Sequence, residues 1–235
     1  MPIKPTLAET GTVPAPTSVL DKLINLLVSP AVVFDEVRVQ PWRPANWLLP
    51  TLLLCLSNLL VFEATVEPEA IGAGIRQLAQ AGQLTVDQVS FLTRHGTMIS
   101  RVAIGVAGFL GVLWSALALW FIGHFFLKTR FPLSKALEIV ALSGTILVVG
   151  MVVTALLVLA TGEPGARPSL SLLCLRGGAS ERLRAVGEVF NFFYLWTAVV
   201  LAIGLARLSR VRFVESAFWV IGYWVFLRLA LLLLA

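Results

Sequence analysis

A histidine and a glutamate lie on either side of one short connection in this sequence, and such a pair can exchange protons near neutral pH. His124 lies near the end of one apolar run and Glu138 opens the next, with Lys128 and Arg130 between them. We expect the His124 and Glu138 side chains to lie at one depth, in contact directly or through water. Two roles are open: a proton-responsive pair, or an interfacial cap that ends two helices. We favour the cap.

A single arginine, Arg228, interrupts the last apolar run. Counted from Glu215, it lies about 20 Å into a hydrocarbon layer of about 30 Å. A charge at that depth is costly unless it is paired. We therefore expect Arg228 to face the helix bundle and to pair with Glu188, with Asn191 as a neutral alternative acceptor. The alternatives are an unpaired arginine that reaches the lipid headgroups, and an outward-facing site for an anion or headgroup.

The usual motifs of catalysis and metal binding are missing. The sequence has no His-Glu-x-x-His motif and no clustered Cys/His spacing. Its three aspartates lie outside the apolar runs: Asp21, Asp35 and Asp87. Only His95 and His124 could serve as the base for a serine nucleophile, and they lie in different regions. We expect no catalytic residue, no metal and no cofactor, and a protein that is not an enzyme.

Three glycines, Gly105, Gly108 and Gly111, recur at every third position of the second apolar run. They do not form a dinucleotide fingerprint, because no strand precedes them. Small residues on a transmembrane helix let a neighbouring backbone approach closely. We therefore expect these glycines to pack against another helix; the alternative is a glycine-lined path for a solute.

The composition is that of an integral membrane protein. Hydrophobic residues make up 58% of the 235 residues, charged residues only 13%, and the mean hydropathy is +0.89. The net charge of +5 does not indicate nucleic-acid binding, because the basic residues are scattered among apolar segments. They are mostly arginine, which is typical of a GC-rich bacterial genome. Two cysteines, Cys55 and Cys174, exclude a disulfide framework.

Five apolar runs are long enough to cross a bilayer. They predict an all-α membrane protein with five transmembrane helices in one bundle, at about 44–62, 102–127, 139–162, 189–206 and 214–235. The long connection 63–101 has helical signals of its own, including a capping box formed by Thr85 and Gln88. Lysine and arginine are densest in the short connections on the N-terminal side. This bias predicts a cytoplasmic N-terminus and an external C-terminus.

The segment before the first span predicts a short amphipathic helical region at 18–40. Apolar residues recur at helical spacing, and Ser18–Asp21 and Ser29–Pro30 are typical helix starts. We expect this segment on the cytoplasmic side, either along the membrane interface or packed on the bundle itself, with Trp42 and Trp47 at headgroup depth. Residues 1–17 are rich in Pro, Thr and Ala, which predicts a disordered tail.

The order of these parts resembles a known family. The segment "LINLLVSPAVVFDEVRVQPWRPANWLLPTLLL" resembles the opening of bacterial YIP1-type membrane proteins, with Pro30 and Phe34 as its Pro-x-x-x-Phe element. "WFIGHFFLKTRFPLSKALEIVALSG" and "WTAVVLAIGLARLSRVRFVESAFWVIGYWVF" are similar to two later helix junctions of the family. The resemblance implies a Yip1-like domain over 18–235, five helices and a cytoplasmic N-terminus, in a bacterial inner membrane. Eukaryotic members bind Rab-type GTPases, but their Asp-Leu-Tyr-Gly-Pro signature is absent here.

Two functions follow as hypotheses from these observations. The first is a non-enzymatic multi-pass protein that binds a protein partner, or a second copy of itself, or organises the lipid bilayer. The second is a small transporter or channel for a solute or lipid. Transporters usually have helices broken around a polar site at mid-membrane, and the central thirds of these runs are nearly all apolar. We therefore prefer the first hypothesis, without nucleic acid as a partner.

Overall fold

The computed structural model describes residues 17–66, 68–163, 165–170, 187 and 191–234. The described residues form helices and contain no strand; Ser169 and Asn191 make one isolated bridge. Five segments are long and apolar enough to cross a membrane, at Ala45–Thr65, Val86–Phe126, Leu133–Thr161, Phe192–Ser209 and Phe213–Ala230. The predicted all-α fold with five spans is therefore confirmed.

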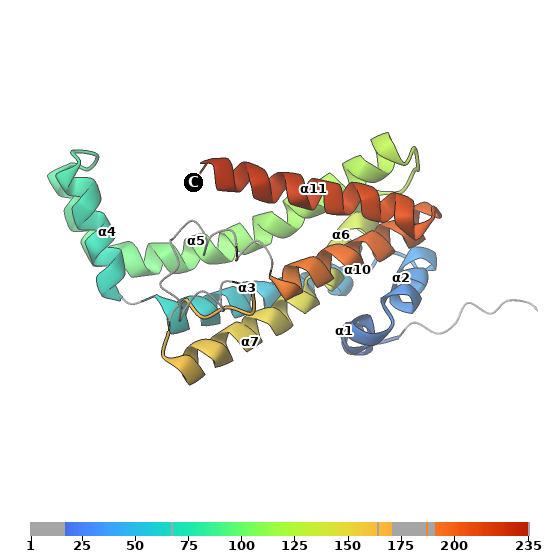
Figure 1. The fold of residues 1–235 in the computed structure, drawn as a ribbon, viewed down its shortest axis with the longest axis horizontal. Helices are drawn as coiled ribbons and strands as arrows, with labels where there is room; N and C mark the ends of the chain where they lie inside the picture. The colour runs from blue at the N-terminus through green and yellow to red at the C-terminus, as the bar shows by residue number, and fades with distance from the viewer. Residues whose placement is uncertain (1–16, 67, 164, 171–186, 188–190, 235) are drawn as a thin grey trace, which may run out of the picture.

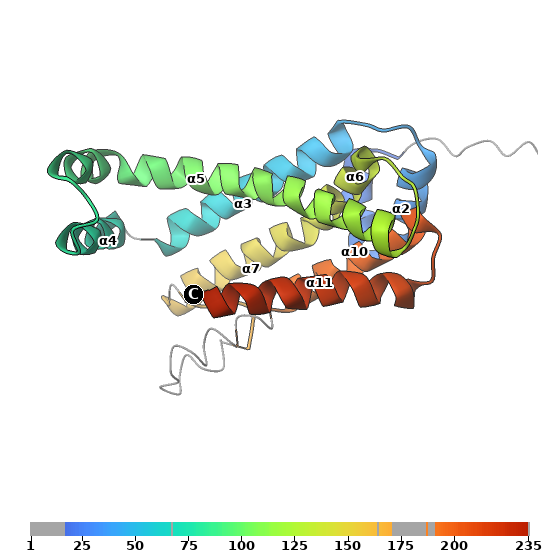
Figure 2. The ribbon, with the colours of Figure 1, turned by 90° about the horizontal axis from the view of Figure 1, so that it is seen from above.

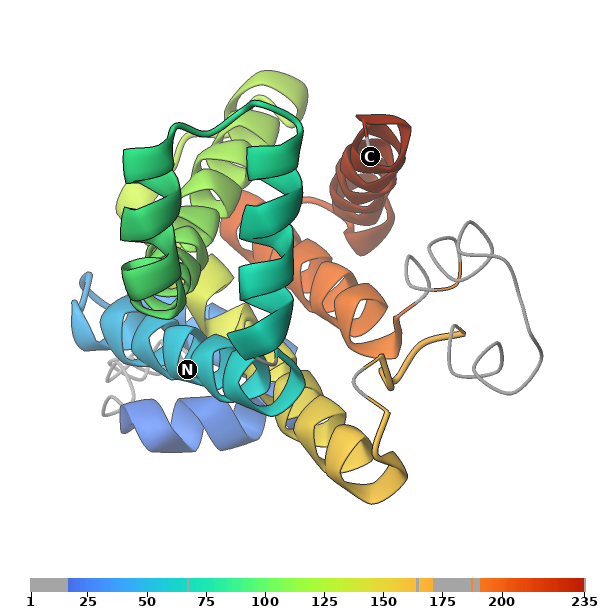
Figure 3. The ribbon, with the colours of Figure 1, turned by 90° about the vertical axis from the view of Figure 1, so that its left-hand side faces the viewer.

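The spans run side by side along the long axis of the molecule (Figure 1). The first is α3 (Ala45–Thr65), and the third consists of α6 (Leu133–Ser143) and α7 (Thr145–Thr161). The fourth, α10 (Phe192–Ser209), packs against both α6 and α7. Viewed along the bundle, the fifth helix, α11 (Phe213–Leu234), lies at the periphery beside α10 (Figure 3). The centre of the bundle is thus made by the third and fourth spans.

Two short helices precede the spans, as the sequence predicts. They are α1 (Val19–Val28) and α2 (Pro30–Val39). The Ser18 side chain accepts a hydrogen bond from the Asp21 N–H and caps α1, and Pro30 occupies the first position of α2. The inner face of the pair packs on the bundle, because Leu26, Phe34 and Val37 are fully buried in its core.

We call the end of the bundle that carries this pair the α1–α2 end. The connections 127–132 and 210–212 lie at the same end, and α4 (Pro68–Gln80) lies at the opposite end (Figures 1 and 2). The predicted tail 1–17 lies outside the described residues except for Thr17. The N–H and the hydroxyl of Thr17 both donate hydrogen bonds to Glu36 of α2.

The second span is longer than the prediction of 102–127. It begins at Val86 as α5 (Val86–Phe121) and continues into a π-helical turn, η1 (Ile122–Phe126). The Thr85–Gln88 capping box is present, but it opens this helix rather than a separate one. At 1.5 Å per residue the helix measures about 60 Å, twice the hydrocarbon thickness. Its polar first turns extend beyond the membrane layer, where they pack against α4.

The third span also begins earlier than the predicted residue 139. Its helix starts at Leu133 and is interrupted at Gly144, where α6 ends and α7 begins. Glu138 therefore lies inside a helix rather than at its start. The hydropathy pattern stops at the charged residues Lys135 and Glu138, yet the helix includes both, because they neutralise each other within it. The last span begins at Phe213, one residue before the predicted boundary.

Candidate functional site

A buried ion pair ties three parts of the chain together at the α1–α2 end. The Lys135 ammonium lies 2.7 Å from Glu138 Oε2 and donates to the carbonyls of Val37 and Gln40, at 2.8 and 2.9 Å. These carbonyls close the C-terminal end of α2, where a cation is favoured by the helix dipole. Lys135 on α6 therefore caps α2 and holds it on the bundle.

The Glu138 carboxylate joins the same cluster to the start of α3. Its Oε1 accepts hydrogen bonds from the Arg43 backbone N–H and from Asn46 Nδ2, both at 2.9 Å. The Glu138 side chain is 0% exposed, so these partners replace the water that the carboxylate loses on burial. All three protons of Lys135 are also used. The pair is a structural clamp, because neither group has an open position for a substrate.

A second polar cluster lies between α1 and α2. Lys22, which is buried, lies 3.2 Å from Glu36 Oε1 and donates to Gln40 Oε1 at 3.3 Å. Burial alone would raise the pKa of Glu36, but hydrogen bonds from Thr17 and Lys22, with the charge of Lys22, lower the pKa below its ordinary value. The ionised carboxylate is thus the form that fixes α1 against α2.

The predicted contact between His124 and Glu138 is not formed directly. His124 lies in η1, is exposed, and stacks on Trp120 with ring centroids 5.2 Å apart and an interplanar angle of 12°. Glu138 points instead into the buried cluster with Lys135 and Asn46. The physical reason is that Lys135, one turn before Glu138 on the same helix, satisfies the carboxylate inside the core. His124 and Glu138 therefore form no direct proton-exchanging pair.

Arg228 faces the bundle, as expected, but contacts aromatic rings. Its Cζ lies 4.1 Å from the ring centroid of Tyr194 on α10 and 5.9 Å from that of Trp224. A guanidinium over an aromatic face is stabilised by the ring quadrupole, more strongly where water is scarce. The expected partner Glu188 lies outside the described residues. Asn191 uses its side-chain oxygen to accept from the Phe193 N–H and caps α10.

Three glycines were predicted to pack against another helix. Only Gly108 has another helix close to the position that a Cβ would occupy. A Cβ on Gly108 would meet Cys55 Sγ at 3.2 Å, whereas nothing lies within 4 Å of one on Gly105 or Gly111. Residues three apart are separated by about 60° around a helix, so three successive glycines cannot share one narrow face. The Gly105 carbonyl still accepts a weak hydrogen bond from Cys55 Sγ at 3.4 Å.

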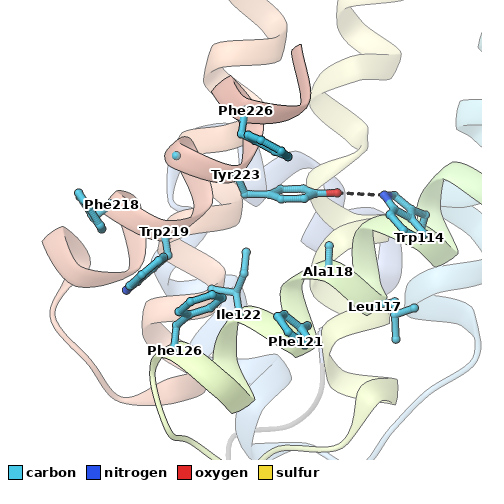
Figure 4. Close-up of a pocket in the computed structure, with 11 residues that line it drawn as sticks. Trp114, Leu117, Ala118, Phe121, Ile122, Phe126, Phe218, Trp219, Tyr223 and Phe226 are labelled. Atoms are coloured by element: carbon cyan, nitrogen blue, oxygen red, sulfur yellow. Dashed lines mark hydrogen bonds between the residues drawn. The ribbon is translucent and has the colours of Figure 1, made fainter. Parts of the chain in front are cut away.

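A groove of about 590 Å³ separates α5 and η1 from α11 (Figure 4). Its walls carry aromatic and aliphatic side chains, including Phe121, Phe126, Trp219 and Phe226. Trp114 Nε1 donates to the Tyr223 hydroxyl at 2.9 Å and joins the two walls. Only an apolar group could fill this groove without losing hydrogen bonds.

The Yip1 domain family matches residues 24–235, which include α2 and every span. The chain belongs to the Yip1 family. No curated protein and no solved structure matches the chain. The Yip1 domain thus begins inside α1. It includes the Lys135–Glu138 clamp, the connections 127–132 and 210–212, and the groove between α5 and α11.

Sequence reasoning identified Glu138 in this Yip1 domain but missed its partners. Lys135 precedes Glu138 by three residues, and this spacing is a signal for an ion pair on one helix. No such signal joins Glu138 to Asn46, because they are far apart in sequence and meet only when α3 packs beside α6. Among the described residues, no three His, Cys, Asp or Glu side chains gather in a group that could hold a metal ion.

Proposed function

We propose that this Yip1-family protein is a non-enzymatic membrane protein that organises the bilayer surface in which it is embedded. The α1–α2 pair is the element that acts on the lipid. The clamp carries this proposal, because Lys135 holds the end of α2 at the ends of the spans and Lys22 joins α1 to α2. A helix that only anchored the chain to lipid would not need such a buried attachment.

The α1–α2 pair has apolar residues on two faces. One face is in the core, and the other exposes Leu20, Ile24, Val28 and Val32, with Val28 82% exposed. Exposed apolar residues at helical spacing beside a membrane are typical of a helix that lies in the headgroup layer. Exposed aromatic side chains at the same end, Trp42, Phe125, Phe126 and Phe213, are typical of the membrane–water boundary. Together they support a position of α1 at the lipid surface.

The proposal includes an orientation, with the α1–α2 end on the cytoplasmic side. Lysine and arginine in short connections remain on that side during insertion. The connections at this end carry Lys128, Arg130, Arg210 and Arg212. The membrane in question is the inner membrane of a bacterium.

Spin labels on α1 test the proposed position in lipid. In full-length protein lacking Cys55 and Cys174, a label is placed at Ile24→Cys, or at Asn25→Cys on the adjacent polar face as a matched control. In liposomes, we expect the Ile24 label to be relaxed mainly by lipid-soluble oxygen and the Asn25 label by a water-soluble nickel chelate. Equal exposure of both labels to the nickel chelate would contradict the proposal.

Binding of a protein partner or a second copy is the second candidate, and the groove between α5 and α11 favours it, since its apolar walls fit a transmembrane helix. A pull-down with the intact protein in detergent tests it. A stoichiometric protein partner, lost when Trp219→Arg is introduced in the groove, would favour this candidate over bilayer organisation. Absence of a partner, together with solute flux into liposomes containing the protein, would favour the transporter instead.

A further inference from the structure

We propose that an arginine-lined site at the α1–α2 end binds the phosphate of an anionic phospholipid headgroup. Two neighbouring pockets, of about 500 and 580 Å³, lie beside α2 and the end of α10, and both are lined by Arg38 and Arg210. Arg207 completes the first pocket and Arg130 the second. This proposal rests on one part of the proposed function, because the site can meet a lipid headgroup only if the α1–α2 end lies at headgroup depth.

The arginines of the site are more numerous than the carboxylates that could neutralise them. Asp35 lies 3.7 Å from Arg38 and 3.3 Å from Arg207, so one carboxylate is shared by two cations. The other carboxylates of this end are engaged elsewhere: Lys22, Lys135 and Arg212 pair with Glu36, Glu138 and Glu215, and Asp21 accepts a hydrogen bond from Ser18 Oγ. Among the described residues, Arg130 and Arg210 therefore have no acidic partner. The site has positive charge available for an anion.

Two features of the backbone and side chains indicate that these cations are held for a ligand. Arg38 Nε is buried and has no hydrogen-bond partner, and an orphaned donor of this kind is rare in folded proteins. Arg210 has a φ of 56°, a left-handed conformation at the end of α10 where glycine is the usual residue. Lys128, with a φ of 53°, shows the same departure in the adjacent connection. Such strain is typical of functional positions.

The chemistry of the walls selects a phospholipid over a free anion. The second pocket adds the hydroxyl of Ser209, which accepts a hydrogen bond from Thr129 Oγ1 at 3.0 Å and keeps its own proton to donate to a phosphate oxygen. The first pocket adds an apolar wall made by Ile203, Val211 and Phe213. A guanidinium matches phosphate through two parallel hydrogen bonds. A ligand with a phosphate beside hydrocarbon therefore fits both pockets, with its acyl chains along α10 and α11.

The test titrates full-length protein in uncharged detergent with short-chain phosphatidylglycerol, and its readout is the rise in the thermal unfolding temperature. Phosphatidylcholine and inorganic phosphate are titrated in parallel. The site variant is Arg130→Gln/Arg210→Gly, since glycine suits the left-handed conformation of residue 210 and keeps the fold. The matched control is Arg94→Gln/Arg212→Gln, which removes two charges as well. Arg212 is 84% exposed and paired with Glu215, and Arg94 lies on α5 near α4.

We expect phosphatidylglycerol to raise the unfolding temperature of the wild type more than phosphatidylcholine does. In the site variant its apparent affinity falls about 25-fold, at about fivefold for each arginine lost, while the control stays within about twofold. An equal fall in both variants, or equal shifts with both lipids, would overturn the site. A full shift with inorganic phosphate alone would overturn its assignment to a lipid. The spin label at Ile24→Cys is measured in a separate experiment, so failure of this site can be distinguished from failure of the proposed function.

Discussion

At the scale of single residues, Lys135 and Glu138 matter because they are buried and fully bonded. Replacing Lys135 by Met leaves the Glu138 carboxylate buried without its cation and frees the carbonyls of Val37 and Gln40. We expect Lys135→Met to lower the free energy of unfolding by about 3–5 kcal/mol. Thermal unfolding in detergent measures the loss. Arg101→Met, which breaks the exposed pair with Glu63, is the control and should have a much smaller effect.

The pKa of Glu36 predicts how the stability of the α1–α2 pair depends on pH. Its pKa in the folded protein lies below the ordinary value of 4.5, so the ionised form stabilises the fold. That stability is fully present above pH 4.5 and is lost as the pH falls through the folded pKa. We expect wild type to exceed Glu36→Gln in unfolding temperature at neutral pH, and the difference to shrink below pH 4.5. A difference that grows on acidification would contradict this assignment.

At the scale of elements, close packing of α10 on α6 depends on Gly204, which no pattern in the sequence distinguishes from the other glycines. A Cβ on Gly204 would meet Ile139 Cγ2 at 2.5 Å and the Phe34 ring at 3.2 Å. Both neighbours are buried, so they cannot move without disturbing the core. We expect Gly204→Ala to cost about 1–3 kcal/mol of unfolding free energy.

The control for this variant is Gly111→Ala, whose added Cβ would have no neighbour within 4 Å. Alanine favours a helix over glycine by about 1 kcal/mol, so this variant should be neutral or more stable. Thermal unfolding of both variants in one detergent compares them. Equal losses in both variants would contradict the assignment, because the Cβ added at residue 111 has no neighbour and helix propensity favours alanine.

At the scale of the whole molecule, five spans place the two ends of the bundle on opposite sides of the membrane. We expect Gln83→Cys, in the turn after α4, to react with a membrane-impermeant maleimide in intact cells. Lys128→Cys, at the α1–α2 end, should react only after the cells are made permeable. Both are introduced into protein lacking Cys55 and Cys174. The opposite pattern would show that the α1–α2 end faces outward.

The sequence by itself determined the number of spans, their approximate positions and the two helices before them. Hydropathy and helical spacing are local properties, and a bilayer enforces them because every span must satisfy its own backbone hydrogen bonds. The starts of α5 and α6 were less predictable. Charged residues there end an apolar run but do not end a helix when they are paired or extend beyond the lipid.

Only the tertiary structure decided which polar groups meet. Glu138 was singled out with His124, yet it bonds Asn46 and the Arg43 backbone, which are more than ninety positions away. In the same way Arg38 joins Arg130 and Arg210 from three separate segments. Such partners depend on the rotation and neighbours of each helix, which are set by the packing of side chains such as Phe34 against Gly204. Hydropathy fixes how deep a residue lies, but only packing fixes the direction in which it points.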